Sequence, residues 1–247
     1  MDAYTVSAEF YDVLQGRDER ERAERLFASP ARRARSGIVE VGAGSGLVTQ
    51  VLARAATVPV HAIEPNPAMR ALLMSRLAAA PTEHRARVTV HPERVQELWP
   101  RQDVPQADLA VCSNVIATLD PGQRHGTWAA LARLVGPQGL LLVDPPPCAL
   151  PEAPRTKVLP QVPVGDDTYS GFLSETPETD HIHLEYTYQV HRDGELLREE
   201  REEFDLWPVA GEELRQELAE AGWVVCRPSP AAPGRGELLT ARVAEHL

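Results

Sequence analysis

The sequence lacks a long apolar run, a cysteine framework and an excess of basic charge, and each absence excludes a class of protein. Its longest apolar stretches, such as residues 139–143, fall far short of the roughly 20 residues that a membrane span needs. Its three cysteines are widely separated and include no C-x-x-C pair, which fits neither a disulfide framework nor a zinc site. With 36 acidic residues against 25 lysines and arginines, the chain has a formal charge of −11 and no visible basic patch. We therefore expect no nucleic-acid, membrane or metal partner.

The length of 247 residues leaves room for one large domain, or for a core with a substantial insertion. The first residues have neither the basic nor the apolar region of a secretory signal, so we expect a cytoplasmic protein.

From residue 37 onward, short apolar runs alternate with helix-like segments, a pattern typical of a parallel sheet covered by helices on both faces. The predicted strands are 38–41, 60–63, 88–90, 109–113 and 140–144, and the predicted helices lie near 47–56, 67–79 and 122–135. One or two helices are expected before this region, around residues 17–27.

The pattern changes after residue 145. A proline-rich stretch to residue 163 has no periodicity and is predicted to be a loop. Residues 182–190 alternate strictly between apolar and polar side chains, which predicts an amphipathic strand, and an Asp-Gly turn favours 196–206 as its antiparallel partner. A helix over 211–221 and strands over 223–226 and 238–243 complete the chain.

The strongest local signal is a buried strand that turns through three alternate glycines, Gly42, Gly44 and Gly46, into a helix. Glycines in such a turn let a ligand approach the backbone closely. The third glycine comes one residue earlier than in the dinucleotide fingerprint, so Leu47 occupies its place and a nicotinamide oxidoreductase is disfavoured. Glu64 ends the next predicted strand, where an acid can accept hydrogen bonds from both hydroxyls of a ribose. The two features together indicate an adenosine-type cofactor.

These motifs resemble the class I S-adenosylmethionine-dependent methyltransferases over residues 36–145. E-x-G-x-G-x-G at 40–46 is similar to the first motif of that family, and A-I-E-P-N-P-A-M at 62–69 is similar to the second. Further matches are P-E-R at 92–94, D-L-A-V-C-S-N at 108–114 and L-V-G-P-Q-G-L-L at 134–141. The resemblance implies an α/β fold with a Rossmann-like, mostly parallel seven-stranded sheet, helices on both faces and a small antiparallel β insertion.

The resemblance also implies the residues that bind S-adenosylmethionine and its product S-adenosylhomocysteine. Glu40 would face the methionine ammonium, the glycine turn would cradle the methionine portion, and Glu64 would hold the ribose. Met69 and Arg94 would flank the adenine, and Tyr11 would close over the methionine carboxylate, although a plain core tyrosine is an equal alternative. The full expected cofactor set is Tyr11, Glu40, Gly42, Ala43, Gly44, Gly46, Glu64, Pro65, Met69, Glu93, Arg94, Ser113 and Asn114.

A narrower resemblance covers the two ends of the chain and the antiparallel insertion. S-A-E-F-Y-D at 7–12 and P-G-R-G-E-L at 233–238 are similar to nucleotide-sugar N,N-dimethyltransferases, which act on amino sugars of antibiotics. This implies a helical cap over 1–35, a cofactor-binding core over 36–145, a β-rich lid for the acceptor over 146–208, and a last helix and strands over 209–247. The expected acceptor is a small molecule, and strand exchange through the insertion would give a homodimer.

Candidate acceptor and catalytic residues follow from the same picture. Tyr4, Asp144, Tyr169 and Tyr186 are predicted walls of the acceptor pocket, with plain aromatic packing as the favoured alternative for Tyr169 and Tyr186. His181 and His183 share one face of the strand 182–190, so either imidazole is a candidate base if that face covers the site; a solvated strand face is the simpler alternative.

Three activities remain open from the sequence: methylation of a nitrogen, methylation of an oxygen, and cofactor binding without catalysis. The D-P-P-P segment at 144–147 is similar to a motif of nucleic-acid amine methyltransferases, but it follows the fifth strand rather than the fourth. Together with the negative charge, this disfavours RNA methylation.

Overall fold

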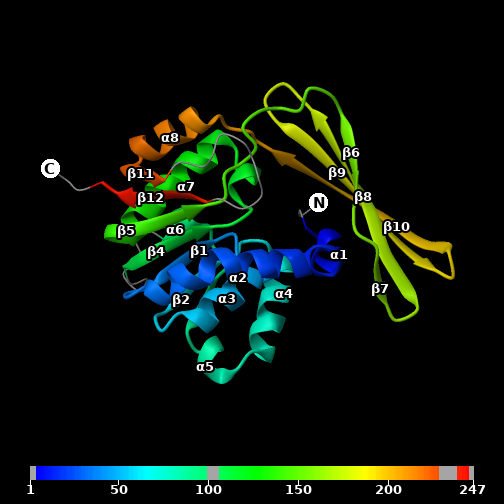
Figure 1. Ribbon diagram of the computed structural model, residues 1–247, viewed down its shortest axis with the longest axis horizontal. Coiled ribbons are helices and arrows are strands. Elements are labelled where there is room, and N and C mark those ends of the chain that lie inside the picture. The colour runs from blue at the N-terminus through cyan, green and yellow to red at the C-terminus, as the bar shows by residue number, and fades with distance from the viewer. Residues whose placement is uncertain (1–3, 99–105, 228–237, 245–247) are drawn as a thin grey trace.

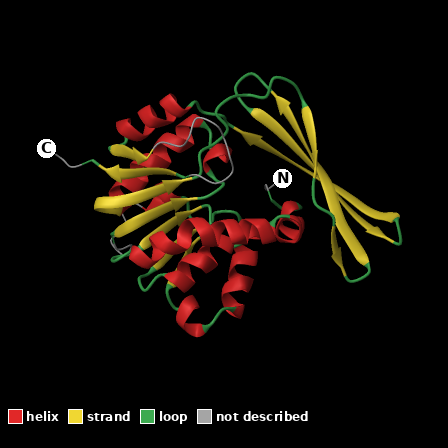
Figure 2. Ribbon diagram, in the orientation of Figure 1, coloured by secondary structure: helices red, strands yellow, loops and turns green. Residues whose placement is uncertain are grey.

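The computed structural model describes residues 4–98, 106–227 and 238–244, which form an α/β core and a separate antiparallel sheet that we call the lid sheet (Figures 1 and 2). The core helices are α2 Gly16–Arg33, α3 Leu47–Ala55, α4 Pro67–Ala79, α5 Thr82–Arg85, α6 Val95–Leu98, α7 Pro121–Leu134 and α8 Gly211–Glu220, with a 3-10 turn η1 at Ile116–Thr118. The core strands are β1 Ile38–Val41, β2 Val60–Ile63, β3 Val88–His91, β4 Ala107–Cys112, β5 Val135–Val143, β11 Trp223–Arg227 and β12 Leu239–Val243. The lid strands are β6 Arg155–Val158, β7 Val162–Val164, β8 Asp167–Pro177, β9 Ile182–Arg192 and β10 Glu195–Leu206, and the helix α1, Ser7–Leu14, lies between the two bodies.

The core sheet has seven strands in the order β11-β12-β5-β4-β1-β2-β3. β1 pairs in parallel with both β2 and β4, while β12 runs antiparallel to its neighbours β5 and β11. The chain moves outward from β1 to β3 on one side and from β4 to β5 on the other. This reversal places a crevice at the carboxyl ends of β1 and β4, where open α/β sheets bind their ligands. The predicted Rossmann-like fold class is confirmed.

Helices cover both faces of the core sheet (Figure 1). On one face, α2 and α3 bury an apolar cluster that includes Phe27 and Leu52 against alternate residues of the central strands. On the other, α7 and α8 bury Trp128 and Leu218 against the remaining strand residues. Because helices cover both faces of the core sheet, its central strands carry apolar side chains on both sides. In the sequence, these strands are therefore short continuous apolar runs.

A buried ion pair joins α7 to α8. The guanidinium of Arg124 donates to both carboxylate oxygens of Glu217, at 3.1 and 2.8 Å, and the indole N–H of Trp128 donates to the same carboxylate at 3.1 Å. Arg124 and Glu217 are almost completely buried. Their geometry satisfies both charges, so the pair fixes how the two helices sit on the sheet.

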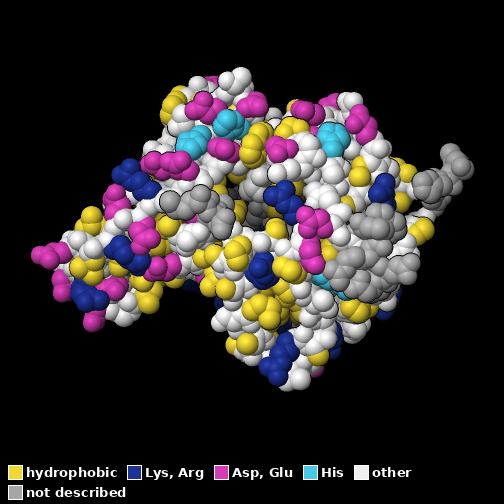
Figure 3. Space-filling model, turned by 180° about the vertical axis from the view of Figure 1, so that it is seen from behind, with side chains coloured by type: hydrophobic (Ala, Val, Ile, Leu, Met, Phe, Trp, Pro, Cys, Tyr) yellow, Lys and Arg dark blue, Asp and Glu magenta, His cyan; other side chains and the backbone are white. Residues whose placement is uncertain are grey.

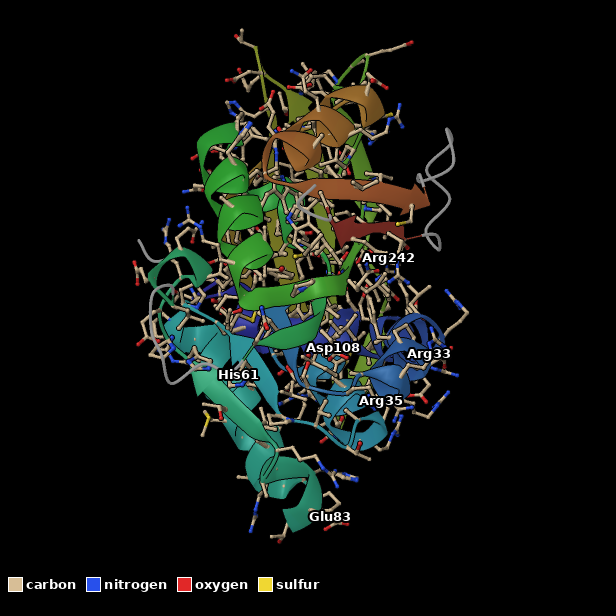
Figure 4. The ribbon with its side chains drawn as sticks, turned by 90° about the vertical axis from the view of Figure 1, so that its left-hand side faces the viewer. Arg33, Arg35, His61, Glu83, Asp108 and Arg242 are labelled. Carbon is tan, nitrogen blue, oxygen red and sulfur yellow. The ribbon has the colours of Figure 1, made fainter. Side chains whose placement is uncertain are left out.

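Asp108 lies at the edge of the core that faces away from the lid sheet, where it joins β4 to the segment before β1 (Figure 4). Its carboxylate accepts hydrogen bonds from the backbone N–H groups of Arg35, Ser36 and Gly37 at 2.7, 3.1 and 3.2 Å. Although burial opposes ionisation, these donors lower the pKa of Asp108. The contact aligns the start of β1 with β4 and thereby sets the register at the opposite, carboxyl edge.

The lid sheet has the order β10-β9-β8-β6, with β7 paired to β8. The predicted amphipathic strand is β9, and its predicted antiparallel partner is β10. The apolar side chains Ile182, Leu184 and Tyr188 are buried on the inner face of the sheet.

The prediction of an irregular loop up to residue 163 is wrong in part, since β6 and β7 lie within that stretch. Both strands are short. Most of the prolines precede β6, Pro160 lies between the two strands, and Pro163 lies in β7, at the edge of the sheet, where proline is tolerated. β8 was not predicted because its residues do not alternate by polarity. The predicted domain boundaries stay predictions, but α2 packs directly on the core sheet through Phe27.

None of the helices in the described ranges has the length and apolar character that a bilayer crossing requires.

Candidate active site

A cavity of about 1620 Å³ lies between the carboxyl ends of the core strands and the inner face of the lid sheet. From behind, the surface between these two bodies is hollowed (Figure 3). Clefts for a single ligand usually measure roughly 300–1,000 Å³. The cavity therefore has room for a cofactor and an acceptor side by side.

The glycine turn forms the floor of the cavity. Gly42 and Gly44 have positive φ values of 70° and 57°, which side chains other than glycine rarely adopt. A Cβ at Gly42 would lie 2.6 Å from Cγ2 of Val115, whereas a Cβ at Gly44 would meet no atom within 4 Å. Gly42 is thus required for packing, and Gly44 leaves open space in which a ligand can approach the backbone.

Glu64 lies beside this turn, at the end of β2. One carboxylate oxygen accepts from the N–H of Gly44 at 2.7 Å, and the other accepts from the N–H of Asn66 at 2.8 Å. Each oxygen keeps a further lone pair for a ligand hydroxyl. Burial raises the pKa of Glu64, while these two N–H donors act in the opposite direction.

Glu40 is the penultimate residue of the adjacent strand, β1, and is almost completely buried. The hydroxyl of Thr49 donates to its carboxylate at 2.6 Å. Burial raises the pKa of Glu40 to about 8, the Thr49 hydrogen bond opposes this rise, and the nearby Glu64 adds to it. A buried carboxyl group with a raised pKa can bind a cationic ligand group, because a nearby positive charge favours the ionised form of the carboxyl.

Asp144 lies at the end of β5 and faces the same cavity. Its carboxylate pairs with the guanidinium of Arg22 on α2 and accepts from the hydroxyl of Ser113 at 2.8 Å and from the N–H of Asn114 at 3.2 Å. The side-chain amide of Asn114 also donates to Glu19 at 3.0 Å. Helix α2 and the segment that follows β4 thus converge on the buried carboxylate at the end of β5.

Aromatic side chains form the wall next to α1. The ring of Tyr4 lies 4.6 Å from that of Phe204, and Tyr186 meets Phe204 edge-on at 5.8 Å. Tyr11 projects into the same space, and burial raises its pKa, as it does that of Tyr4. This wall is apolar apart from its hydroxyl groups.

A cluster of charges forms the far wall, on the inner face of the lid sheet. The carboxylate of Glu175 is buried and pairs with both Arg155 and Lys157, whose side chains are about half exposed. Although burial opposes ionisation, these two cations lower the pKa of Glu175. The cluster therefore has an excess of one positive charge and faces the cavity.

Most of the predicted cofactor and acceptor residues line this one cavity. They are Tyr4, Tyr11, Glu40, Gly42, Ala43, Gly44, Glu64, Pro65, Met69, Arg94, Ser113, Asn114, Asp144 and Tyr186. Gly46, Glu93 and Tyr169 are not among the lining residues. Gly46 packs against Leu73, and the hydroxyl of Tyr169 reaches Glu9 on α1 at 3.4 Å.

The two histidines that were candidate bases do not line the cavity either. His183 pairs across the strands with Asp205 at 3.1 Å, and His181 contacts Asp180 at 2.8 Å. The side chains that alternate with them on β9, such as Leu184 and Tyr186, are the ones that face the cavity. The structure therefore places the histidine face of the strand away from the site.

Sequence reasoning missed several residues of the site. Arg22 reaches the cavity from α2, and Arg155, Lys157 and Glu175 reach it from strands that were not predicted. Lys157 is the only lysine in the sequence, but a single charged residue in a proline-rich stretch has no pattern that would single it out.

Residues 39–141 match the family described as methyltransferase domain. The matched segment runs from β1 into β5 and contains the glycine turn, Glu64 and Asn114. This segment of the core is therefore similar to a methyltransferase domain, which indicates an enzyme. A search of curated proteins found no match.

Solved structures with the same fold cover nearly the whole chain. CalS10, an amino pentose methyltransferase from Micromonospora echinaspora involved in calicheamicin biosynthesis, is 22% identical over 92% of this chain and 91% of its own, with a TM-score of 0.70. The sugar N-methyltransferase KedS8 from Streptoalloteichus is 21% identical over 97% and 93%, with a TM-score of 0.73. DesVI from Streptomyces venezuelae is 18% identical over 96% of each chain, with a TM-score of 0.75. At these identities the likeness shows the fold, which includes the lid sheet as well as the core.

Proposed function

We propose that the protein transfers a methyl group from S-adenosylmethionine to the amino nitrogen of a small molecule, an amino sugar being the class we favour. The observation that carries the proposal is the single large cavity in which the glycine turn, Glu40 and Glu64 lie opposite the inner face of the lid sheet. The acceptor class is supported by CalS10, an amino pentose methyltransferase, and by KedS8, a sugar N-methyltransferase.

The residues present fit the cofactor. The open space above Gly44 would receive the methionine portion, Glu64 has lone pairs for the ribose hydroxyls, and Glu40 would compensate the methionine ammonium. Met69 and Arg94 would flank the adenine. When bound, S-adenosylmethionine supplies a methyl group on an electrophilic sulfonium, so the protein has to align the acceptor and exclude water.

The lining of the cavity favours nitrogen over oxygen as the acceptor atom. Among the described residues that line it there is no histidine, and Asp144 is already engaged by Arg22, Ser113 and Asn114. An alcohol needs a strong base in the transition state, whereas an amine in its neutral form needs only a weak one or solvent. Asp144 would orient the acceptor amine through its carboxylate, and the lid sheet would exclude water.

The charged far wall supports an acceptor that carries an anionic group in addition to its amine. Arg155 and Lys157 together exceed the charge of Glu175 by one, so they would bind an anionic group such as the diphosphate of a nucleotide sugar. Replacing both with glutamine would raise the KM for such an acceptor and leave the affinity for S-adenosylhomocysteine unchanged.

The test is incubation of the protein with S-adenosylmethionine and a panel of nucleotide-linked amino sugars, free amino sugars and phenols, with mass spectrometry of the products. We expect a mass increase of one or more methyl groups on the amino sugars alone. Methylation of phenols in preference would make the protein an O-methyltransferase, and a cofactor that binds without turnover on any acceptor would make it a non-catalytic partner.

A further inference from the structure

Helix α1 contacts the cofactor-binding turn with one side and the lid sheet with the other. It lies between the core and the lid sheet in the ribbon (Figure 1). It has only eight residues, and isolated helices shorter than roughly 12–15 residues are marginal in water. Its position must therefore be set by its contacts with the two bodies.

On the core side, Asp12 closes a ring of contacts around Ser45, the residue between Gly44 and Gly46. The hydroxyl of Ser45 donates to one carboxylate oxygen of Asp12 at 2.6 Å, and Arg76 on α4 pairs with the other. Arg76 also donates through Nε to the backbone carbonyl of Ser45 at 2.9 Å. Both the side chain and the backbone of the turn are thus tied to α1.

On the lid side, two carboxylates make the connection. Arg198 of β10 donates to both oxygens of Glu9, at 2.5 and 3.0 Å. Glu202 of β10 accepts from the N–H groups of Val6 and Ser7 at 3.3 and 2.7 Å, so it satisfies the open N-terminal end of the helix.

An aromatic contact adds to this lid-side attachment. The ring of Phe10 stacks on that of Tyr188 at 4.4 Å, and the hydroxyls of Tyr188 and Ser7 lie 2.9 Å apart. The attachment is therefore both polar and apolar, and it spans three residues of the helix.

We propose that α1 couples cofactor binding to the position of the lid sheet, and that Asp12 is the positioning residue through which the coupling acts. The proposal rests on the proposed function, because the ligand on the glycine turn is taken to be S-adenosylmethionine or its product. A ligand that settles on Gly44 orders Ser45, Ser45 orders Asp12, and Asp12 holds the helix that carries Glu9 to the lid sheet. Tyr11, the neighbour of Asp12, is carried into the cavity by the same helix.

This arrangement explains why an acceptor site built on a separate sheet can be aligned with a methyl donor held by the core. The lid sheet contributes the acceptor walls, and the core contributes the donor site. Without α1, the Asp12 and Glu9 contacts between the two would be lost together. Coupling of this kind is reciprocal, so a closed lid also favours the bound cofactor.

The experiment is hydrogen exchange followed by mass spectrometry, with and without saturating S-adenosylhomocysteine, on the full chain and three variants. Asp12→Ala breaks the core-side contact. Arg198→Gln removes the ion pair with Glu9 on the lid side, and it leaves the Glu202 and Phe10 contacts and the glycine turn untouched. Glu24→Gln is the matched control, since it removes the exposed Glu24–Arg54 ion pair, which contacts neither the turn nor the lid. Calorimetry on each protein sets the ligand concentration that saturates it.

In the parent protein and in Glu24→Gln, we expect the ligand to slow exchange in the glycine turn, in α1 and in residues 182–206 of the lid, by about fivefold or more in the lid. In both variants, saturating ligand would still protect the turn. The protection of residues 182–206 would be lost in Asp12→Ala and reduced in Arg198→Gln, which keeps the Glu202 and Phe10 contacts with the lid. A residue with a merely structural role would change the exchange of the free protein and not this response to ligand.

Equal lid protection in the parent and Asp12→Ala would overturn the proposal while leaving the proposed function intact. Failure of S-adenosylhomocysteine to bind the folded parent would overturn both, because no ligand would then act on the turn.

Discussion

Two carboxylates of the site, Glu40 and Glu64, lie at the ends of neighbouring strands but differ in their surroundings. Glu64 accepts two backbone hydrogen bonds and keeps access to the cavity, whereas Glu40 is buried and accepts a hydrogen bond from the hydroxyl of Thr49. The first environment suits recognition of neutral hydroxyls, and the second suits a cation that brings its own charge.

The raised pKa of Glu40, about 8, predicts how the affinity for the cofactor depends on pH. Glu40 is protonated below that value in the free protein, and an ammonium favours its ionised form, so binding must release a proton. We expect the affinity for S-adenosylhomocysteine to rise between pH 6 and pH 8, approaching tenfold per pH unit, in a series of calorimetric titrations. Glu40→Gln is the control, and a slope that persists in this variant would assign the proton to another group.

The histidine that the sequence singled out and the aspartate that the structure places at the site lead to opposite expectations. Since His183 faces away from the cavity, His183→Ala is expected to leave kcat within a factor of about two. Asp144→Asn disturbs the contacts with Arg22 and Ser113 and is expected to lower kcat by on the order of a hundredfold. Steady-state kinetics on both variants measures these changes in kcat. A larger loss of kcat in His183→Ala than in Asp144→Asn would restore the histidine as the base.

Among the elements, α7 and α8 depend on one buried ion pair, so its loss has a large expected effect. Glu217→Ala leaves the guanidinium of Arg124 buried without its counterion, which we expect to cost about 3–5 kcal/mol of unfolding free energy. The matched control on the same helix is Glu220→Ala, an exposed residue expected to change stability by less than about 1 kcal/mol. Urea unfolding of the two variants measures both values, and equal effects would contradict the role given to the pair.

The core elements could be predicted from the sequence because each has a complete local signal. The strands β1 and β2 were predicted to the residue, since a buried parallel strand is a short apolar run with clear ends. β8 had no such signal, because it carries Gly171 at its centre and polar residues on both faces.

The candidate site was predictable to the same extent and for the same reason. The glycine turn and Glu64 are close in sequence and follow predicted strands. Arg22, Arg155 and Lys157 reach the cavity only through tertiary packing, which no local pattern reports. The alternation of β9 showed that its two faces differ, but which face met the cavity depended on how the lid sheet sits on the core.

At the scale of the whole molecule, the lid sheet exposes apolar side chains that the core does not cover. Val158, Phe172, Leu196 and Leu197 all lie on it and are 72%, 38%, 51% and 52% exposed. The homodimer implied by the sequence resemblance would bury such residues. Analytical ultracentrifugation is expected to show a dimer that dissociates in Phe172→Glu, and a monomer at all assay concentrations would contradict the prediction.

The central claim is that the glycine turn and Glu64 bind S-adenosylmethionine, and calorimetric titration tests it most directly. S-adenosylmethionine, S-adenosylhomocysteine and NADH would each be titrated into the parent protein and into Glu64→Ala. We expect the two sulfur compounds to bind the parent and to bind Glu64→Ala about 10- to 100-fold more weakly, because two hydrogen bonds to a charged group are lost, and NADH not to bind. Binding of NADH in preference, or no binding of either sulfur compound to folded protein free of carried-over ligand, would contradict the account.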